Sequence, residues 1–358
     1  MPGIGVVTTI AGKCRGCYAC VRNCPVKAIK VEDGQATVIK DLCISCGYCV
    51  RVCTQNAKHI KNDLDQVKDA LATKETFALL APAFAVEFHD ELSPGQVVSA
   101  LKRLGFAKVY EVAWGAERVT QEYVKIIKGR HEPGIISTPC PAIVNLIEVK
   151  YPHLVPRLAR VVSPMIATGR MIKKEHKDVF TVFIGPCVAK KSEIMDSEVS
   201  DSIDAVLTFV ELRELLKDSS INFKKLPEAS FDGKEAYLGR LYPVSGGLLR
   251  SAALSEDMVD NEIIVVEGKD NCIDFLDALS TDKDCPEFVD ILFCEGCING
   301  PMMSVDLPGY ARRVVAVDFA RQSRKDTPNI NKKEHNFPLI DACREFSPKN
   351  VDMPDPTE

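Results

Sequence analysis

The sequence predicts an α/β protein, α+β overall, in which a small cysteine-rich domain precedes a larger α/β domain. Two observations predict this division. Eight of the fifteen cysteines fall in the first 60 residues, and beyond residue 76 apolar runs of strand length alternate with amphipathic helices. We expect domains at residues 1–60 and 77–340, joined by a helical bridge over 61–76 and followed by a loose tail over 341–358.

The first domain is defined by a repeated cysteine spacing. Residues 14–25 read CRGCYACVRNCP and residues 43–53 read CISCGYCVRVC, so C-x2-C-x2-C-x3-C occurs twice. This is the bacterial ferredoxin run, in which the fourth cysteine of each run ligates the other cluster. It predicts two [4Fe-4S] clusters, one held by Cys14, Cys17, Cys20 and Cys53, the other by Cys43, Cys46, Cys49 and Cys24. Two zinc knuckles are the alternative, but zinc needs four thiolates of its own at each site and does not explain the interlocked eight.

The second domain follows from the apolar runs and the helices between them. The runs are rich in Val, Ile and Phe and do not alternate with polar residues, which is typical of strands buried in a parallel sheet. They are FALLAPAFAV, AKVYEVAW, GIIST, VFTVFIG, AVLTF, EIIVVEG and FVDILF. One helix should begin after Ser93 at Pro94 and end at Gly105, and another should begin near Ser163 or be kinked there, because Pro164 disfavours the interior of a helix.

Four of the remaining cysteines share one context. Cys140 follows GIIST, Cys187 follows VFTVFIGP, and Cys294 and Cys297 follow FVDILF, so each lies where a predicted strand gives way to a turn. The carboxyl ends of strands in an α/β sheet are where sites are built. Four convergent thiolates indicate a third Fe–S cluster or a zinc site, and spacing alone leaves both open.

Three of these segments resemble a known family. TPCPAIVNLIEVKYP, GPCVAKKSE and FCEGCINGP are similar, in this order, to the signature segments of the [FeFe]-hydrogenase catalytic domain, and SGGLLRSAAL resembles its glycine-led helix. The resemblance covers about residues 77–320. It implies a two-lobed α/β domain with a catalytic H-cluster between the lobes.

The resemblance also implies roles for individual residues. Cys140, Cys187 and Cys294 would ligate a [4Fe-4S] cubane, and Cys297 would bridge it to a di-iron subsite carrying CO, cyanide and an azadithiolate. Lys190 would donate to a cyanide, for which an ammonium group is well suited. The segments expected to line the subsite are Ala81 with Pro82, and the backbone of Ser245, Gly246 and Gly247.

The departures from the family pattern concern proton transfer. The position before the first ligand usually holds a proton-relay cysteine, but here it is Pro139, whose side chain has neither donor nor acceptor. Gly185 replaces the usual methionine, and CEGC is one residue shorter than the usual spacing. Ser163 and Glu193 match later members of the usual relay, and Glu295 is a candidate for another route. These departures resemble the sensory branch of the family, in which slow turnover would suit detection of H2.

The sequence therefore predicts an enzyme that interconverts H2 with protons and electrons and acts as an H2 sensor or regulator. The alternative is a hydrogenase-like Fe–S assembly or electron-transfer protein without the di-iron subsite. Expected partners are an external electron-transfer or signalling protein and the maturation proteins that install the subsite. The net charge of −5 and the absence of a long apolar segment argue against nucleic-acid and membrane partners, and we expect a cytoplasmic location.

Overall fold

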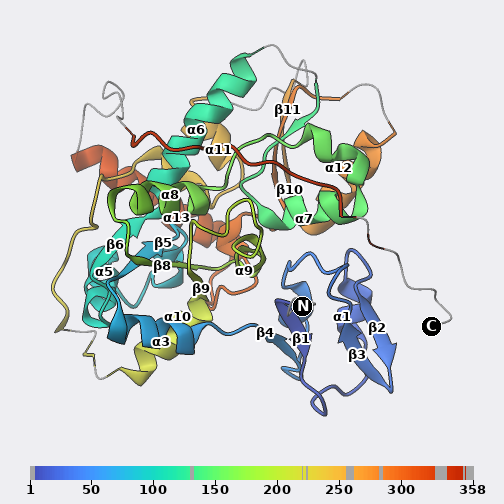
Figure 1. The fold of residues 1–358 in the computed structure, drawn as a ribbon, viewed down its shortest axis with the longest axis horizontal. Coiled ribbons are helices and arrows are strands. Elements are labelled where there is room, and N and C mark those ends of the chain that lie inside the picture. Colours follow the sequence, from blue (N-terminus) through green and yellow to red (C-terminus); the bar gives the residue numbers. More distant parts are fainter. Residues whose placement is uncertain are drawn as a thin grey trace.

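The structure is a computed structural model that describes residues 5–129, 133–219, 221–222, 225–254, 262–281, 285–326, 337–349 and 351. Figure 1 shows residues 5–60 as a separate small unit that lies beside α7 and α12 of the larger domain. The larger domain contains two parallel sheets with helices around them. No helix in the described ranges is both long and apolar enough to cross a bilayer.

The small unit has the internal repeat that its cysteines predicted. Its antiparallel pairs are β1 (Val7–Thr9) with β4 (Lys58–Ile60), and β2 (Ile29–Glu32) with β3 (Gln35–Val38). The short helices α1 (Ala19–Asn23) and α2 (Tyr48–Arg51) follow equivalent cysteines. The two halves also share left-handed backbone positions, at Gly16 and Ser45, Tyr18 and Gly47, and Lys27 and Asn56. Strands β2 and β3 are joined by a hairpin turn at Asp33 and Gly34, whose φ values of 49° and 73° suit the two-residue turn of a hairpin.

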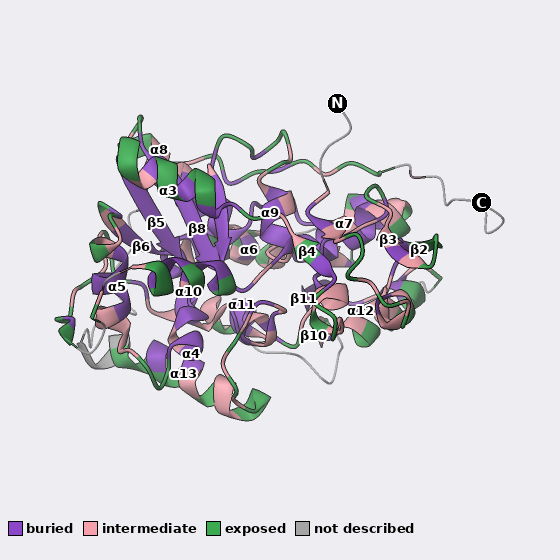
Figure 2. Cartoon of the chain, turned by 90° about the horizontal axis from the view of Figure 1, so that it is seen from below, coloured by how far each residue is buried: buried purple, intermediate pink, exposed green. Residues whose placement is uncertain are grey.

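All seven apolar runs contain strands. The first sheet has the order β6-β5-β8-β9 and is parallel throughout. Its strands are β5 (Thr76–Leu80), β6 (Lys108–Glu111), β8 (Phe180–Gly185) and β9 (Ala205–Thr208). Figure 2 shows β5 and β8 buried along their length, as the unbroken apolar pattern predicted.

Helices surround this sheet on both sides. They are α3 (Leu64–Thr73), α4 (Phe84–Glu87), α5 (Pro94–Arg103), α6 (Val112–Lys128), α8 (Pro164–Glu175), α9 (Ala189–Glu193), α10 (Phe209–Asp218), α11 (Gly247–Ser251) and α13 (Gly309–Asp326). Ser93 caps α5 in a capping box with Gln96, so the predicted start of that helix is confirmed. Ser163 caps α8, so of the two possibilities at Pro164 the structure shows a helix start and not a kink. The predicted bridge contains α3.

The second sheet has the order β10-β11-β7 and is also parallel. Its strands are β10 (Ile263–Glu267), β11 (Phe288–Leu292) and the short β7 (Ile135–Ile136), and its helices are α7 (Pro141–Lys150) and α12 (Lys269–Leu279). Short 3-10 helices lie at Pro152–Arg157, Leu238–Leu241 and Cys297–Asn299. The predicted strands are thus divided between two sheets, one in each lobe.

The small unit shares a hydrophobic core with the second sheet. Ile44 packs in one cluster with Ile143 and Phe293, and the Tyr48 ring meets the Phe293 ring edge-on at 5.8 Å. The Asn145 amide donates to the carbonyl of Ile44 at 3.2 Å. The cysteine-rich unit is therefore held against one lobe of the larger domain by apolar packing.

The expectation of a loose tail is wrong for the described part of it. The Val162 amide donates to the carbonyl of Ala342 at 2.9 Å, and the Lys349 amide donates to that of Glu148 at 2.8 Å. Arg344 is only 5% exposed. Polar composition suggested a solvated segment, but backbone bonds and a buried arginine fasten it across both lobes. Residues 350 and 352–358 lie outside the described residues.

Candidate functional site

The carboxyl ends of strands from both sheets meet around two adjoining cavities. Ala81 and Pro82 follow β5, Cys187 follows β8, Cys140 follows β7, and Cys294 follows β11. Each sheet is parallel, so its loops of this kind emerge at one edge. The structure therefore brings together cysteines that are up to 157 residues apart in the sequence, as the resemblance implied for the region between two lobes.

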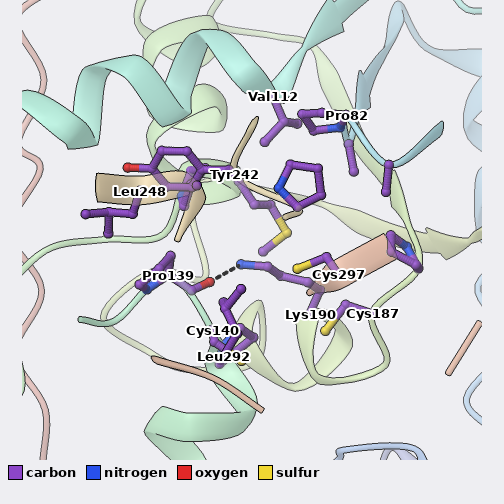
Figure 3. Close-up of a pocket in the computed structure, with 18 of the residues that line it drawn as sticks. Pro82, Val112, Pro139, Cys140, Cys187, Lys190, Tyr242, Leu248, Leu292 and Cys297 are labelled. Atoms are coloured by element: carbon purple, nitrogen blue, oxygen red, sulfur yellow. Dashed lines mark hydrogen bonds between the residues drawn. The ribbon is translucent and has the colours of Figure 1, made fainter. Parts of the chain in front are cut away.

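The larger cavity has a volume of about 90 Å³ and is mainly apolar. Figure 3 shows Pro82 and Val112 on one side of the cavity and Cys187 and Cys297 on another. The Lys190 side chain runs from the side of these two cysteines toward Pro139. Ala81 and Gly247 also line the cavity. An apolar cavity of this kind strengthens the electrostatic effect of any charge or dipole in its wall.

The smaller cavity, of about 30 Å³, is lined by five thiols. Four are those of the predicted third cluster: Cys140, Cys187, Cys294 and Cys297. The fifth is Cys46, a predicted ligand of the second ferredoxin cluster. Three of the four, Cys140, Cys187 and Cys297, line the larger cavity too. The two spaces therefore share a wall of sulfur.

The thiols at this junction are strongly desolvated. Burial and, to a smaller extent, the neighbouring Cys140 raise the pKa of Cys187 to about 11. Burial also raises the pKa values of Cys294 and Cys297, and the other thiols of the group add to both shifts. Like charges crowded in an apolar site are costly, so these sulfurs are suited to bind a metal cluster whose positive charge neutralises them.

Lys190 is held by two partners at the cavity wall. Its Nζ donates to Glu193 Oε2 at 2.7 Å and to the carbonyl of Pro139 at 3.5 Å. Glu193 has a fully buried side chain and also accepts from Arg344 of the tail at 3.3 Å. Glu193 does not itself line either cavity, so in this structure it positions Lys190.

Two of the departures noted in the sequence have structural counterparts. Pro139 lines the larger cavity and contributes a carbonyl to Lys190 where a relay thiol was expected. A Cβ on Gly185 would lie 2.8 Å from the ring of Phe183 and 3.0 Å from Cβ of Ala81. Phe183 itself lines the cavity. The space left by the missing methionine is therefore occupied by an aromatic ring from two residues earlier on the same strand, β8.

Other predicted residues lie near the cavities without lining them. The hydroxyl of Ser163 accepts a hydrogen bond from the Ile166 amide and caps α8. Pro164, the first residue of that helix, lines the larger cavity. Ser245 and Gly246 form the turn before α11, and only Gly247 of the three reaches the lining. No hydrogen bond between Ser163 and Glu193 occurs among the described contacts, so the structure does not join them into a relay.

Glu295 is directed elsewhere. It lines a separate polar groove of about 630 Å³, together with Arg51 of the ferredoxin-like unit, Lys269 and Arg312. It does not line the apolar cavity beside the bridging position. The route through Glu295 that the sequence suggested is therefore not supported by its position.

One of the two predicted sets of ferredoxin-like cysteines lines a common cavity. Cys24, Cys43, Cys46 and Cys49 line one apolar cavity. Burial raises the pKa of Cys49 to about 12, and the thiol of Cys20 in the other set adds to the shift. Backbone amides four residues on donate to the sulfurs of Cys24 and Cys53 at 3.2 and 3.3 Å. Cys17 is exposed, whereas Cys46 reaches the junction cavity, so the sulfur sites run from the surface to the interior.

The donor set fits the group that the resemblance implies. Cys140, Cys187, Cys294 and Cys297 would hold a cubane, and Lys190 presents an ammonium group to the adjoining cavity. A cubane distributes four thiolates over four irons, so they need not converge on one ion. In the described part of the chain, no three His, Cys, Asp or Glu side chains converge in that way. All fifteen cysteines are free.

One residue at this site was missed in the sequence. Asp290 on β11 lines the larger cavity and is 2% exposed. Burial raises its pKa to about 7, partly offset by the Leu249 amide and the Ser137 hydroxyl. The available signal was the position of Asp290 as the one charged residue inside the apolar run FVDILF, four residues before Cys294.

Comparison with known proteins agrees with this geometry. Residues 74–301 match the family model of the iron only hydrogenase large subunit, C-terminal domain, and residues 7–54 match that of a 4Fe-4S dicluster domain. Iron hydrogenase 1 of Clostridium pasteurianum is 26% identical over 300 residues, which covers 67% of this chain and 52% of that protein. The periplasmic [Fe] hydrogenase large subunit of Nitratidesulfovibrio vulgaris is 29% identical over 273 residues, covering 67% of this chain and 65% of that protein.

More distant relatives include a protein with another role. The cytosolic Fe-S cluster assembly factor NAR1 of Kluyveromyces lactis is 29% identical over 153 residues, which covers 39% of this chain and 33% of that protein. Among solved structures, the [FeFe]-hydrogenase HydA1 from Chlamydomonas reinhardtii has a TM-score of 0.61 at 19% identity and covers 81% of this chain and all of that chain. This likeness concerns the fold. The family model of the iron only hydrogenase large subunit matches more than half of the residues of this chain, so the chain belongs to the iron-only hydrogenase family.

Proposed function

We propose that this protein is an [FeFe]-hydrogenase that interconverts H2 with two protons and two electrons, at a low rate suited to sensing or regulation by H2. One observation carries the proposal. Four buried thiols surround one cavity, and three of them also line an adjoining apolar cavity to which Lys190 presents its amino group. A cubane-only protein would not need the second cavity or its ammonium group.

The bound cofactor would supply an open metal site for H2 and a base for the first proton. The protein's own residues hold and surround it. Cys297 lies at the wall between the two cavities, where a bridging ligand would be needed, and Ala81 and Pro82 exclude water from the other side. Lys190, fixed by Glu193, is placed to donate to an anionic ligand.

Electrons would travel along the line of sulfur sites. The exposed Cys17 marks the surface end, and Cys46 shares a cavity with Cys294 at the inner end. The first 60 residues contain eight Lys and Arg against three Asp and Glu, a charge of +5, whereas the remaining chain contains 37 against 47. This asymmetry favours an acidic electron carrier or signalling protein as the external partner. The fifteen free cysteines favour a reducing, cytoplasmic location, which remains a prediction.

The low rate is inferred from Pro139. A proline at the usual relay position neither donates nor accepts a proton, so proton exchange with the cavity should limit turnover. Binding of H2 does not depend on that relay. A protein that binds H2 well and turns it over slowly would suit a sensor.

The test is infrared spectroscopy of anaerobically purified protein that has been treated with the synthetic azadithiolate di-iron complex. We expect CO and cyanide bands that shift under H2, and we expect Cys297→Ser to prevent their appearance. Cys343→Ser, which removes an exposed thiol of the tail, is the matched control and should keep the bands.

The opposite result would favour the second candidate. A protein that shows no such bands, with iron and sulfide sufficient for three cubanes only, would refute the hydrogenase proposal. It would then resemble its NAR1 relatives, and a role in Fe–S assembly or electron transfer would replace the one proposed.

A further inference from the structure

The larger cavity contains a candidate for the proton-exchange group that the sequence lacks at Pro139. Apart from its three cysteines, the titratable side chains among the described residues that line it are Lys190, Tyr242 and Asp290. A group that exchanges protons with the cavity must be one of these or a water. Two of the three are already engaged.

Lys190 and Tyr242 are unsuited by their partners. Lys190 is in a buried ion pair with Glu193 at 2.7 Å, so releasing its proton would leave that pair broken. Tyr242 presents its ring to the cavity, and in Figure 3 its hydroxyl points away from the thiols; it lies 2.8 Å from the hydroxyl of Thr120. Burial raises the pKa of Tyr242 well above its usual value, which makes it a poor proton source.

Asp290 has the opposite properties. Its carboxyl is fully enclosed, and the Oδ2 atom has no hydrogen-bond partner among the described residues. A buried carboxylate with one oxygen left without a partner is expensive, so the neutral acid is favoured there. Burial raises the pKa of Asp290 to about 7, which leaves both protonation states accessible near neutral pH.

A way out of the cavity follows from the strand register. Asp290 lies opposite Val265 on the neighbouring strand β10, and Glu267 is two residues further along that strand, on the same face. Glu267 is half-buried, and its charge contributes to the raised pKa of Asp290. Gly268, the next residue, lines the large polar groove. A proton leaving Asp290 toward Glu267 therefore moves toward solvent.

Other charged and titratable groups face Asp290 from the elements packed around it. They are Tyr123 on α6, Tyr242 before α11, Glu267 on β10, Cys297 after β11 and Lys190 on α9. Lys190 is the one cation of this set, and its charge is already shared with Glu193. The proton on Asp290 is therefore held by burial and by Glu267 rather than displaced by a cation.

We propose that Asp290 replaces the missing relay thiol and exchanges protons between the active-site cavity and Glu267 at the edge of the polar groove. In each transfer the O–H bond at Oδ2 breaks, the proton passes to an acceptor in the cavity, and the carboxylate takes a new proton from the Glu267 side. The reverse direction runs the same steps backwards, and no electron moves. This inference rests on the proposed function, because it assigns the proton route of the same site.

The first experiment does not depend on activity. Protein carrying only its cubanes is titrated from pH 5 to 9 in an infrared difference measurement, in H2O and in D2O. We expect the carbonyl stretch of a buried carboxylic acid, shifted in D2O, to disappear near pH 7. The band should be absent in Asp290→Asn and present, at a shifted position, in Asp290→Glu. A wild-type protein without the band, or an Asp290→Asn variant that keeps it, would overturn the inference.

The second experiment measures turnover. Matured protein is assayed for exchange between H2 and D2O as a function of pH. Removing a general acid or base typically costs 10²- to 10⁴-fold, so Asp290→Asn should be slower by at least about 100-fold and lose its pH dependence near 7. Asp290→Glu should recover part of the rate. Glu287→Gln, an exposed carboxyl just before the same strand, should exchange like wild type.

The outcomes separate the two proposals. A variant Asp290→Asn with intact CO and cyanide bands and wild-type exchange would overturn the relay and leave the proposed function standing. A wild-type protein that takes up no di-iron complex would overturn the proposed function, and the carboxyl titration would still decide whether Asp290 holds a proton. Cubane absorbance equal to that of wild type serves to establish that each variant is folded.

Discussion

Arg344 should fasten the tail to the active-site wall, and replacing it with glutamine tests this. Its guanidinium donates to Glu193 at 3.3 Å and to Asp196 at 2.8 Å, and its side chain is 4% exposed. Glu193 is fully buried and would keep Lys190 as its remaining partner. The substitution therefore removes two charge-assisted bonds without leaving a bare buried carboxylate.

The expected magnitude follows from these contacts. A hydrogen bond to a charged group contributes about 1.5–3 kcal/mol, and the Asp196 side chain is 27% exposed, so its share is smaller. We expect the free energy of local opening of the tail to fall by about 2–3 kcal/mol, a factor of roughly 30–160 in the opening equilibrium.

The assay is native-state hydrogen exchange. The amide of Val162 is bonded to the carbonyl of Ala342 in the tail, so its exchange reports when the tail lifts. The control is Arg160→Gln, which removes a 3.2 Å pair with Glu345 whose side chains are 71% and 56% exposed. That pair should contribute less than about 1 kcal/mol. Equal effects of the two substitutions, or a change of less than about threefold for Arg344→Gln, would refute the reasoning.

Three further predictions follow from burial, close contact and charge. The folded pKa of Asp290 is raised to about 7 from an unfolded value near 4, so its contribution to stability is full below about pH 4 and is lost as pH rises to 7. In denaturant unfolding, the free energy of unfolding of Asp290→Asn should therefore exceed that of wild type by a difference that grows to about 4 kcal/mol by pH 8. A difference that does not depend on pH would contradict this. Gly247→Ala should destabilise the protein by about 3 kcal/mol or prevent its folding, because the added Cβ would lie 2.0 Å from a backbone oxygen, whereas Gly309→Ala meets only ordinary contacts and should unfold like wild type. Reversing the charges of Lys13 and Arg15 should slow reduction of the ferredoxin clusters by an acidic carrier about 10-fold or more at low salt, and the difference should shrink at high salt; a salt-independent rate would contradict this.

Much of the local structure could be read from the sequence. The cysteine repeat, the seven strands and the starts of two helices were each found where they were expected. The hairpin turn at Asp33 and Gly34 likewise depends only on neighbouring residues. Ligand spacing, turn chemistry and helix capping are short-range properties, so they can be predicted without knowledge of the fold.

The candidate site could be predicted from the sequence only in part, and the rest depended on the tertiary structure. Cysteines at strand ends were recognisable from the sequence, as was the family resemblance of the segments around them. Their convergence, the contact of Cys46 with their cavity, and the separation of Glu295 from it were decided by how two sheets and a small domain pack. No local pattern gives the distance between residues that are more than 100 positions apart.

The sequence by itself determined which residues are able to bind Fe–S clusters, because the spacing of the cysteines is a property of the sequence. Only the tertiary structure decided which groups are buried together. It took Asp290 out of water, which raises its pKa, and it brought Arg344 from the tail to Glu193. Desolvation and long-range pairing are properties of the packed interior, where apolar surroundings make a charge costly or a partner necessary.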